Sequence, residues 1–487
     1  MAGPAPQEPV KSQQKCIANF ALLCCLAVLV ALIFSSVNIW EDVEEDITED
    51  NCSRDCRIEL VENIPEHLSF HADGSPRFPL SAGFHALLDQ ARYSVEMVSP
   101  VWDLNAWDVE AKQGQLLFQR LLRLVSRGVK LKIVSSLTNS AELKTLAEHN
   151  SPLLRRHPDA EVHFINMTAL TRGGLHSSFW IVDRKHIYIG SAGMDWRSLF
   201  KRKELGVMVF NCSCLALDLH RVFLFYWQLH DKDYIPSIWS KRVTALYGRH
   251  DGLEMQLNSS QAVAYVSTSP ERFCPKYRTK DLDAIHQVIQ SAKTFIFISV
   301  TDYLPLLSWP YRGTTVTRYW SPIDEMIREA AVLRGVRVRL LISFWRRTHP
   351  LTFNFVTSLR SLCTQLINCS IEVKFFGHKE HSDDLQHGLN HNKYMVTDNA
   401  VYIGNHNWVG IDFALSAGVG LVVKMKNSVA EGEVTIVEHV RAAFERDWRS
   451  PYSKSLHGNR DGHGKFRNLN QMYTEIHEEN EWNHNSY

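Results

Sequence analysis

The chain has no excess charge of either sign, because 53 lysines and arginines balance 53 aspartates and glutamates. A formal net charge of zero excludes a global field that would draw in nucleic acid or an anionic membrane, although it leaves room for a local basic groove. Hydrophobic residues at 45% and charged residues at 22% are ordinary for a globular protein. A length of 487 residues is too long for one ordinary core, so we expect two domains or one large domain with two parts.

Charged residues are absent from segment 17–40, which is almost wholly apolar. About 20 apolar residues are enough to span the core of a bilayer. Lys11 and Lys15 precede the segment, and acidic residues dominate positions 41–46 after it. This charge order predicts a signal-anchor at 17–40 behind a cytosolic tail at 1–16, with the rest of the chain luminal or extracellular. A cleaved signal peptide is the alternative, but the segment is longer than a typical signal-peptide core and lacks a small-residue cleavage site.

Cysteine is scarce, and seven of the ten cysteines lie beyond the apolar segment. An odd number outside the cytosol predicts at least one free or intermolecular thiol. Cys212 and Cys214 have no accompanying cluster of metal ligands, so a disulfide or a buried thiol is favoured there over a metal site. The spacing allows bridges within two close pairs without fixing the connectivity: Cys52 with Cys56, and Cys363 with Cys369.

Acceptor sequons for N-glycosylation occur five times. Any one of them could arise by chance, but five on a segment independently placed outside the cytosol predict a glycoprotein. The acceptors are Asn51, Asn166, Asn211, Asn258 and Asn368.

The folded part of the chain contains one unit written twice. Each copy has a helix end running into an apolar strand, then an amphipathic helix closed by Arg-Gly, and then further strands. The glycine after each of these helices is typical of a C-cap. Landmarks matched in the same order argue against a coincidence between two generic α/β stretches. The matched stretches are 91–99 with 292–299, 127–136 with 334–343, and 162–165 with 371–376.

This duplication predicts an α/β fold of two pseudo-symmetric lobes that together form one luminal domain. We expect the lobes at residues 60–250 and 251–452. An acidic stalk is expected before them at 41–59, and a polar, mostly unpacked tail after them at 453–487.

Each lobe carries a histidine motif followed by a glycine turn, with the pattern His-x-(Lys or Ser)-x4-Asp. The second copy reads His391-Asn-Lys393-Tyr-Met-Val-Thr-Asp398, followed by Gly404-Asn-His-Asn407. The first copy reads His176-Ser-Ser178-Phe-Trp-Ile-Val-Asp183, followed by Gly190-Ser191-Ala-Gly193.

Strand alternation places His391 and Lys393 on one face. An imidazole beside an ammonium suits a phosphodiester, because the ammonium neutralises non-bridging oxygens while the imidazole attacks phosphorus or carries a proton. The glycine turn with Asn407 adds amide donors, as an oxyanion site would. Asp183 and Asp398 could each orient an imidazole by accepting its other N–H. If the lobes face each other, one motif histidine is the nucleophile and the other is the general acid.

With these paired motifs the chain resembles the phospholipase D superfamily, whose HxKxxxxD motif occurs twice and builds one site from both halves. The resemblance covers roughly residues 60–452. The apolar start and three further stretches are similar to the animal type II membrane branch, which contains lysosomal exonucleases acting on single-stranded DNA and RNA from the 5′ end. These stretches are 190–198, 203–206 and 211–214. Segments 12–16, 177–183 and 351–355 are most similar to a branch member described as inactive.

The resemblance implies one site without metal or cofactor, which binds a phosphodiester of nucleic acid or phospholipid through Lys393, Asn407 and Ser191. It further implies attachment to a membrane of the secretory or endolysosomal pathway through the N-terminal helix, and a homodimer by family analogy.

Two departures from the family pattern fall in the first motif, where Ser178 replaces lysine and Gly193 replaces asparagine. In the second half, Asn405 replaces the usual serine or threonine. Losing one preorganised oxyanion donor typically costs about 10²–10³ in rate. The resemblance therefore implies that hydrolysis is absent or severely impaired. The alternatives are a working luminal phosphodiesterase that acts through a phosphohistidine, as a 5′ single-strand exonuclease or on phospholipid, and a purely structural surface module.

Overall fold

The chain divides into two compact units, Met1–Thr48 and Glu49–Tyr487. The computed structural model describes residues 19–28, 52–70, 78–136, 160–230, 232–236, 239–258, 260–311, 314–377, 387–426 and 434–455. In the first unit, residues 19–28 form an exposed helix. Among the described residues, no helix has both the length and the apolar character needed to cross a membrane. Most of the expected anchor, and most of the expected tail at 453–487, lie outside the described residues.

The second unit is built on two large mixed sheets. The first has the strand order β2-β1-β10-β8-β7-β3-β5-β6. Neighbouring strands are antiparallel from β1 across to β3, and parallel from β3 to β6. The bounds are β1 Arg57–Asn63, β2 Phe78–Pro79, β3 Ser94–Ser99, β5 Lys130–Ser136, β6 Ala160–Ile165, β7 Phe179–Val182, β8 His186–Gly190 and β10 Glu204–Phe210.

The second sheet has the order β11-β12-β23-β21-β20-β14-β18-β19-β24, with β13 paired to β12. From β12 to β19 it repeats the order and the strand directions found from β1 to β6. The repeated landmarks of the sequence are thus matched by a repeated topology. The bounds are β11 Leu253–Leu257, β12 Ser260–Ser269, β13 Thr279–Lys280, β14 Phe295–Val300, β18 Arg337–Ser343, β19 Ile371–Phe376, β20 Lys393–Thr397, β21 Ala400–Ile403, β23 Gly418–Met425 and β24 Ser453–Ser455.

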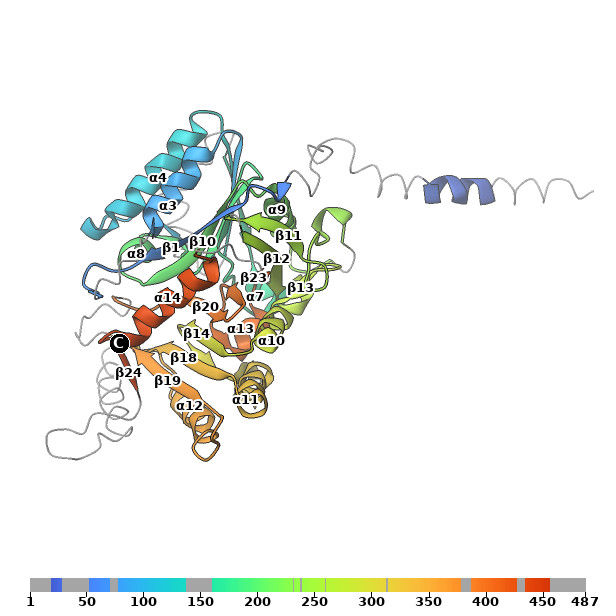
Figure 1. Ribbon diagram of the computed structural model, residues 1–487. Coiled ribbons are helices and arrows are strands. Elements are labelled where there is room, and N and C mark those ends of the chain that lie inside the picture. Colours follow the sequence, from blue (N-terminus) through green and yellow to red (C-terminus); the bar gives the residue numbers. More distant parts are fainter. Residues whose placement is uncertain are drawn as a thin grey trace, which may run out of the picture. The chain divides into compact units, whose positions relative to one another are not determined.

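Helices connect and cover these strands (Figure 1), and three short strand pairs complete the unit. The helices are α3 Leu80–Gln90, α4 Lys112–Val125, α7 Met167–Thr171, α8 Trp196–Phe200, α9 Ser213–Trp227, α10 Asp281–Ser291, α11 Pro322–Arg334, α12 Leu351–Ser361, α13 Gly410–Leu415 and α14 Ile436–Arg449. The short pairs are β4 Trp102–Asp103 with β9 Met194–Asp195, β15 Tyr303–Leu304 with β22 Trp408–Val409, and β16 Leu306–Tyr311 with β17 Thr314–Tyr319.

The strand that follows the first histidine motif is buried on both faces. Trp180 of β7 stacks on Phe84 of α3, with ring centroids 4.4 Å apart. Its neighbour Phe179 lies against Tyr226 of α9. Successive side chains of a strand point to opposite faces, so α3 and α9 cover opposite faces of the first sheet. This double cover explains why the motif strands read as continuous apolar runs rather than as alternating ones.

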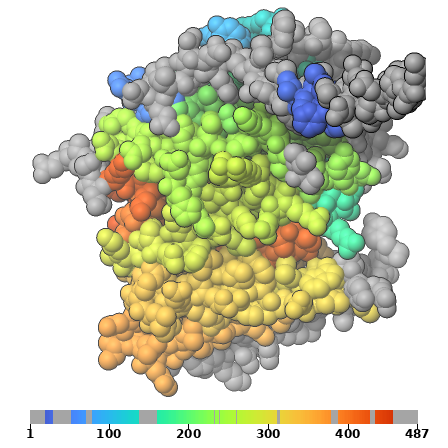
Figure 2. All heavy atoms as spheres, turned by 90° about the vertical axis from the view of Figure 1, so that its right-hand side faces the viewer, coloured from blue at the N-terminus to red at the C-terminus, as the bar shows by residue number. Residues whose placement is uncertain are grey.

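The last long helix of each half contacts the sheet of the other half: α9 packs on β12, and α14 packs on β1. Two halves joined in this way form one folded unit rather than two separate domains. Most of the face shown in the space-filling view belongs to the second half, coloured yellow-green to orange (Figure 2).

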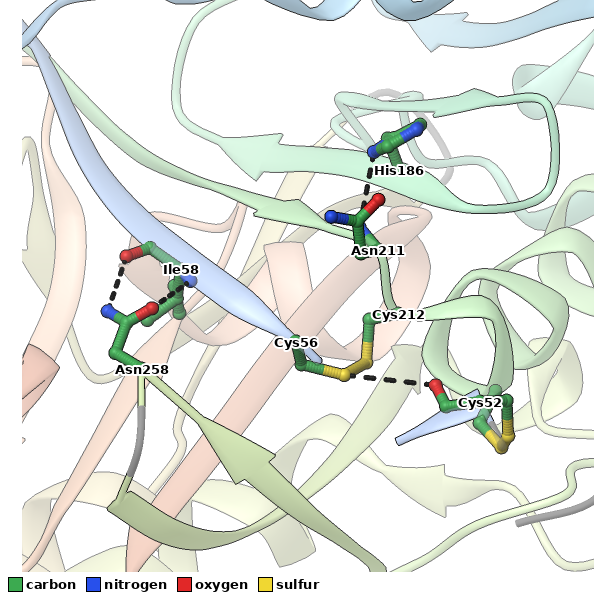
Figure 3. The surroundings of a disulfide bond; sticks show 8 residues. Cys52, Cys56, Ile58, His186, Asn211, Cys212 and Asn258 are labelled. Atoms are coloured by element: carbon green, nitrogen blue, oxygen red, sulfur yellow. Dashed lines mark hydrogen bonds between the residues drawn. A yellow bond between two sulfur atoms is a disulfide. The ribbon is translucent and has the colours of Figure 1, made fainter. Parts of the chain in front are cut away.

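Disulfides join the start of β1 to the start of α9 (Figure 3). Cys52 bonds to Cys214 and Cys56 bonds to Cys212, so a bridge between Cys52 and Cys56 is wrong. Cys52 and Cys56 lie just before β1, and Cys212 and Cys214 lie at the start of α9. The bridge between Cys363 and Cys369 is confirmed. The sequence alone did not show that the pairs cross.

Three other outcomes concern the cysteines and the bounds of the fold. The Cys274 thiol is free, in agreement with the odd count of cysteines. The folded part begins earlier than residue 60, since β1 starts at Arg57 within the expected stalk. It ends later than residue 452, since β24 pairs with β19. The helical pattern of the sequence marks neither of these additions.

Candidate phosphodiester site

Backbone hydrogen bonds place each histidine motif on the opposite half of the fold. The N–H of His391, just before β20, donates to the carbonyl of Lys203 at 2.8 Å. The N–H of His176, just before β7, donates to the carbonyl of Ala417 at 2.8 Å. The two contacts are equivalents in the repeat, because Lys203 precedes β10 and Ala417 precedes β23. Each motif histidine therefore bonds to the residue immediately before the corresponding strand of the other half.

The second motif meets a carboxylate. Glu204, the first residue of β10, is fully buried, and its two oxygens lie 2.9 Å from Nδ1 of His391. Burial lowers the pKa of His391 to about 4, with Glu204 opposing and Lys393 adding to that effect. Burial acts to raise the pKa of Glu204, but His391 and Lys393 outweigh it and the pKa is lowered. At neutral pH the ring is thus neutral, with Nδ1–H donated to an ionised Glu204 and the Nε2 lone pair free to react.

Lys393, the first residue of β20, is buried next to this pair. Its ammonium donates to the carbonyl of His391 at 3.0 Å and lies 3.4 Å from the Thr301 hydroxyl. Burial lowers the pKa of Lys393 to about 8, while Glu204 and Asp302 raise it. The side chain is therefore charged at neutral pH and available to an anionic oxygen, as the sequence predicts for a phosphate ligand.

The aspartates of the motifs do not orient the histidines, and that expectation is wrong. Asp183 accepts hydrogen bonds from the backbone N–H groups of Arg92, Tyr93 and Ser94. Asp398 accepts from the N–H groups of Lys293 and Thr294. In both halves the carboxylate holds the turn before the strand that pairs antiparallel with the motif strand, β3 with β7 and β14 with β20. An aspartate five residues beyond the lysine position lies at the far end of its strand, away from the histidine.

The polar residues of the two glycine turns, Ser191, Asn405 and Asn407, have different roles: some belong to the site and one connects the two halves. Ser191 donates to Glu204 and so supports the carboxylate rather than facing a ligand. Asn405 crosses between the halves, because its amide donates to the carbonyl of Gly190 at 2.7 Å and its oxygen accepts from Val419 N–H at 3.1 Å. Asn407 presents a buried side-chain oxygen without a hydrogen-bond partner among the described residues. Of the three, only Asn407 has a polar atom left for a ligand.

The first motif lacks the carboxylate that the second one meets. In the repeat register, Gly418 at the start of β23 stands where Glu204 stands at the start of β10. A Cβ atom built on Gly418 would lie 2.0 Å from Nε2 of His406. The His406 ring therefore fills the space of the missing side chain. His176 consequently has an imidazole and not a glutamate as its neighbour, with ring centroids 5.5 Å apart.

A second carboxylate approaches the same ring from α13. Oδ1 of Asp412 lies 4.0 Å from Nε2 of His176, beyond hydrogen-bond distance. Asp412 accepts a hydrogen bond from the backbone of Asn407 and feels the charge of Lys393 as well as that of His176. Asp412 thus links His176 of the first motif to Lys393 of the second, while the approach of His176 to His391 stays a prediction. The side chain of His176 retains 32% of its exposure and is open to a ligand.

The two substitutions of the first motif remove polar groups without leaving strain. The Ser178 hydroxyl donates to the carbonyl of Ala192 and is closed within its own loop, with 1% of the residue exposed. A Cβ on Gly193 would meet nothing closer than the Ser99 hydroxyl at 3.5 Å, so the missing asparagine would fit. In the strand register Val101 corresponds to Asp302, the residue that faces Lys393. The first half has thus lost the cation and its counter-charge together.

Fold and site together define a class: a duplicated α/β phosphodiesterase scaffold with one complete half-site and one degenerate half-site. A family profile described as "PLD3/4, PLD-like domain" matches residues 74–381. The chain is 50% identical to "Inactive phospholipase D5" of Mus musculus over 454 residues, which covers 91% of this chain and 82% of that protein. It is 38% identical to "5'-3' exonuclease PLD4" of Mus musculus, with 86% and 82% covered. The chain therefore belongs to the phospholipase D family.

A solved structure supports the fold alone. The chain is similar to a phosphatidylserine synthase of Haemophilus influenzae with a TM-score of 0.54 and 13% identity, covering 89% of this chain and 92% of that one.

Sequence reasoning missed three residues of the site, namely Glu204, His406 and Asp412. For Glu204 the sequence did contain a signal. Glu204 begins β10, the strand that pairs with the strand before the glycine turn, and the equivalent strand of the second half, β23, begins with Gly418 instead. Comparing the two halves beyond the histidine motifs would have exposed this loss. His406 and Asp412 gave no such signal, because Ala192 and Ser198 occupy the equivalent positions in the first half.

Proposed function

We propose that this chain is a phospholipase D-family protein whose site binds phosphate-bearing groups without efficient turnover. One observation carries the proposal: Glu204 supports His391, whereas Gly418 and the His406 ring replace a carboxylate beside His176. The absence of a cation at Ser178 points the same way. The name of the Mus musculus relative, "Inactive phospholipase D5", agrees with this proposal.

The chemistry of the two half-sites explains the expected loss. Nε2 of His391 can attack phosphorus and form a P–N bond, because the ring is neutral and held by Glu204. The bond to the leaving oxygen then breaks only if that oxygen receives a proton, and His176 is the group placed to supply it. No carboxylate of the described residues lies within hydrogen-bond distance of His176, since Asp412 comes no closer than 4.0 Å to its Nε2, so the ring is not held as Glu204 holds His391. Without lysine at position 178, the charge developing on phosphate oxygens is neutralised from one side only.

A second candidate is a slow phosphodiesterase, and the intact pair of His391 and Glu204 favours it. The two candidates separate in a direct assay. The purified full chain is incubated at acidic and neutral pH with a 5′-hydroxyl single-stranded oligonucleotide and, in parallel, with phosphatidylcholine vesicles. We expect no turnover above that of His391→Ala. Turnover that His391→Ala abolishes would establish the second candidate and overturn the first.

A reversion series tests the cause of the loss. Ser178→Lys with Gly193→Asn restores the missing cation and amide but leaves His176 without a carboxylate, so we expect this variant to stay inactive. Gly418→Glu alone must clash with the His406 ring, so it is paired with His406→Ala. We expect hydrolysis only when all four substitutions are combined. Full activity of the first pair alone would show that the carboxylate is dispensable and that our explanation is wrong.

We further propose that segment 17–40 anchors the chain and places the folded unit on the luminal side as a glycoprotein. The three disulfides support an oxidising compartment. Asn211 and Asn368 are exposed, whereas Asn166 and Asn258 are partly buried and engaged in hydrogen bonds; Asn51 lies outside the described residues. The test is removal of N-glycans from the full chain in sealed microsomes. We expect protease protection and a mobility shift that Asn211→Gln and Asn368→Gln reduce. A chain digested in intact microsomes would contradict the topology.

A further inference from the structure

We propose that His176, His406 and Asp412 form a binding site for a divalent first-row transition metal, with Zn²⁺ as the ion of best fit. The site occupies the place of the degenerate half-site. It does not rest on the absence of turnover, since a metal can bind these side chains whether or not His391 reacts.

The three side chains already surround one point. One ligand atom from each residue lies within 4.8 Å of the other two. Ligand atoms around a tetrahedral zinc with bonds of about 2.1 Å are separated by about 3.4 Å. Small side-chain rotations that move each ligand atom inward by about 1 Å would bring the three atoms to the spacing of a tetrahedral site. Because His176 is partly exposed, the ion has a route of entry from solvent.

Two of the ligands present buried atoms that the described residues leave unpartnered. His406 is 1% exposed, and its Nδ1 has no hydrogen-bond partner. Asp412 is 8% exposed, and its Oδ2 has none either. An unpaired polar atom in a buried position is destabilising, so two in one cluster require an explanation. A metal ion coordinated by both would remove the cost.

The second nitrogen of His406 is held as it is in many metal sites. Nε2 of His406 contacts the hydroxyl of Ser269, the last residue of β12. If Nε2 carries the proton and donates it to that oxygen, Nδ1 keeps its lone pair and can ligate a metal.

The cluster belongs to one side of the pseudo-symmetric fold. In the repeat register Ala192 and Ser198 stand where His406 and Asp412 stand. These two ligands therefore surround only the histidine that has lost its carboxylate. Position 418 accepts only glycine while His406 is present, since the Cβ of any other residue would overlap the His406 ring. The glycine and the histidine consequently form one structural change.

Local charge permits a dication. Lys393 interacts electrostatically with Asp412, and its ammonium opposes a metal. The Asp302 carboxylate also interacts with Asp412, so two acidic side chains accompany one ammonium. Two imidazoles and one carboxylate suit zinc or its first-row neighbours, whereas Mg²⁺ and Ca²⁺ prefer sets of oxygen atoms. Three protein ligands leave a fourth position for water or a phosphate oxygen.

The test uses the full chain after treatment with a chelator, titrated with ZnCl₂ or CoCl₂ alone. We expect one tight ion per chain, a visible Co²⁺ spectrum of tetrahedral type, and no competition from Mg²⁺. His406→Ala and Asp412→Asn should each weaken Zn²⁺ binding at least tenfold and remove that spectrum, because each substitution takes away one direct ligand. Both variants are also compared with wild type by thermal unfolding without metal, which confirms that they fold.

The controls address the other histidines of this chain, which has 23 in all. His349→Ala removes an exposed histidine outside the cluster, and a second control replaces the tail histidines His457, His463, His477 and His484. Both should keep the Co²⁺ spectrum and the affinity of wild type. A spectrum that survives in His406→Ala and Asp412→Asn, or that disappears in the tail variant, would overturn the proposal. Neither result depends on whether phosphodiesters are hydrolysed.

Discussion

The character of the site depends on single residues at equivalent positions. Glu204 and Gly418 begin corresponding strands, yet one gives His391 a buried hydrogen-bond partner and the other yields its space to His406. Lys393 and Ser178 differ in the same way, one presenting a cation and the other a hydroxyl closed on its own loop. A local change from carboxylate to imidazole turns a proton-transfer site into a candidate metal site. The rest of the scaffold need not move.

At this scale Lys393 predicts how anion binding depends on pH. Its pKa is lowered to about 8, so the ammonium is present at pH 7 and is lost as pH rises through 8. Sulfate keeps its charge across this range and therefore reports on the protein alone. We expect the sulfate affinity to fall about tenfold or more between pH 7 and pH 9.5, the value of one charge-assisted hydrogen bond. Titration calorimetry measures it.

Two lysine variants separate this effect from general charge. Lys393→Met should bind sulfate weakly at both pH values and show no pH dependence. Lys374 is a matched control, because burial also lowers its pKa while its ammonium donates to the carbonyl of Trp448, away from the motifs. Lys374→Met should retain the pH dependence. An affinity that is equal at pH 7 and pH 9.5 in wild type would refute the assignment of Lys393.

Secondary-structure elements explain how each histidine motif reaches the other half. The residue just before each motif histidine forms a backbone bridge to the other half of the fold. Its partner there is the residue just before β23 or β10. The position of β1 is fixed by two disulfides to the first turn of α9, and by Asn258, whose side-chain amide exchanges two hydrogen bonds with Ile58 (Figure 3). Because β1 lies beside β10, these links stabilise the strand that carries Glu204.

The disulfides from Cys52 to Cys214 and from Cys56 to Cys212 should together stabilise the fold more than the short one from Cys363 to Cys369. The two long bridges close separations of 162 and 156 residues, and the short one closes a separation of 6. Because either long bridge alone keeps β1 tied to α9, loop-closure entropy predicts a loss of about 5 kcal/mol or more only when both long pairs are changed to alanine, against about 2 kcal/mol for the short pair. Urea unfolding of these two variants measures the difference. Equal losses would show that chain entropy does not dominate here.

For the whole molecule, the duplicated strand order could be predicted because it leaves local marks in the sequence. Gly128 and Gly335 end equivalent helices in the left-handed region, with φ of 83° and 65°. The contacts between the halves leave no such marks. Neither the partner of Cys52 nor the role of Asp183 follows from spacing, since both are decided by which strands lie side by side. The cluster around His406 likewise depends on a long-range contact to Ser269.

The halves are joined by buried charges, and these provide the last prediction. Lys203 and Asp447 are fully buried with Nζ 2.6 Å from Oδ2, and beside them Arg446 contacts Glu62 at 2.7 Å. Lys203 precedes the strand of Glu204, while Asp447 lies on α14 of the other half. Glu62 also lies 3.7 Å from Lys203, and Arg446 lies 2.8 Å from Asp447, so removing one member leaves a buried cluster of unbalanced charge rather than a lone ion. The loss should therefore be at the lower end of the about 3–5 kcal/mol that breaking an isolated buried pair costs.

Asp447→Leu and Lys203→Met should each lower the free energy of unfolding by about that amount, as measured by urea titration. The double variant should lose less than the sum of the two, because it leaves neither charge of the pair behind. Arg449→Ala is the control on the same helix: the guanidinium is 77% exposed, and its pair with Glu445 should contribute at most about 0.5 kcal/mol. Strictly additive losses for Lys203 and Asp447 would show that the two residues do not interact. The halves would then be held together by apolar packing between α14 and β1 rather than by this ion pair.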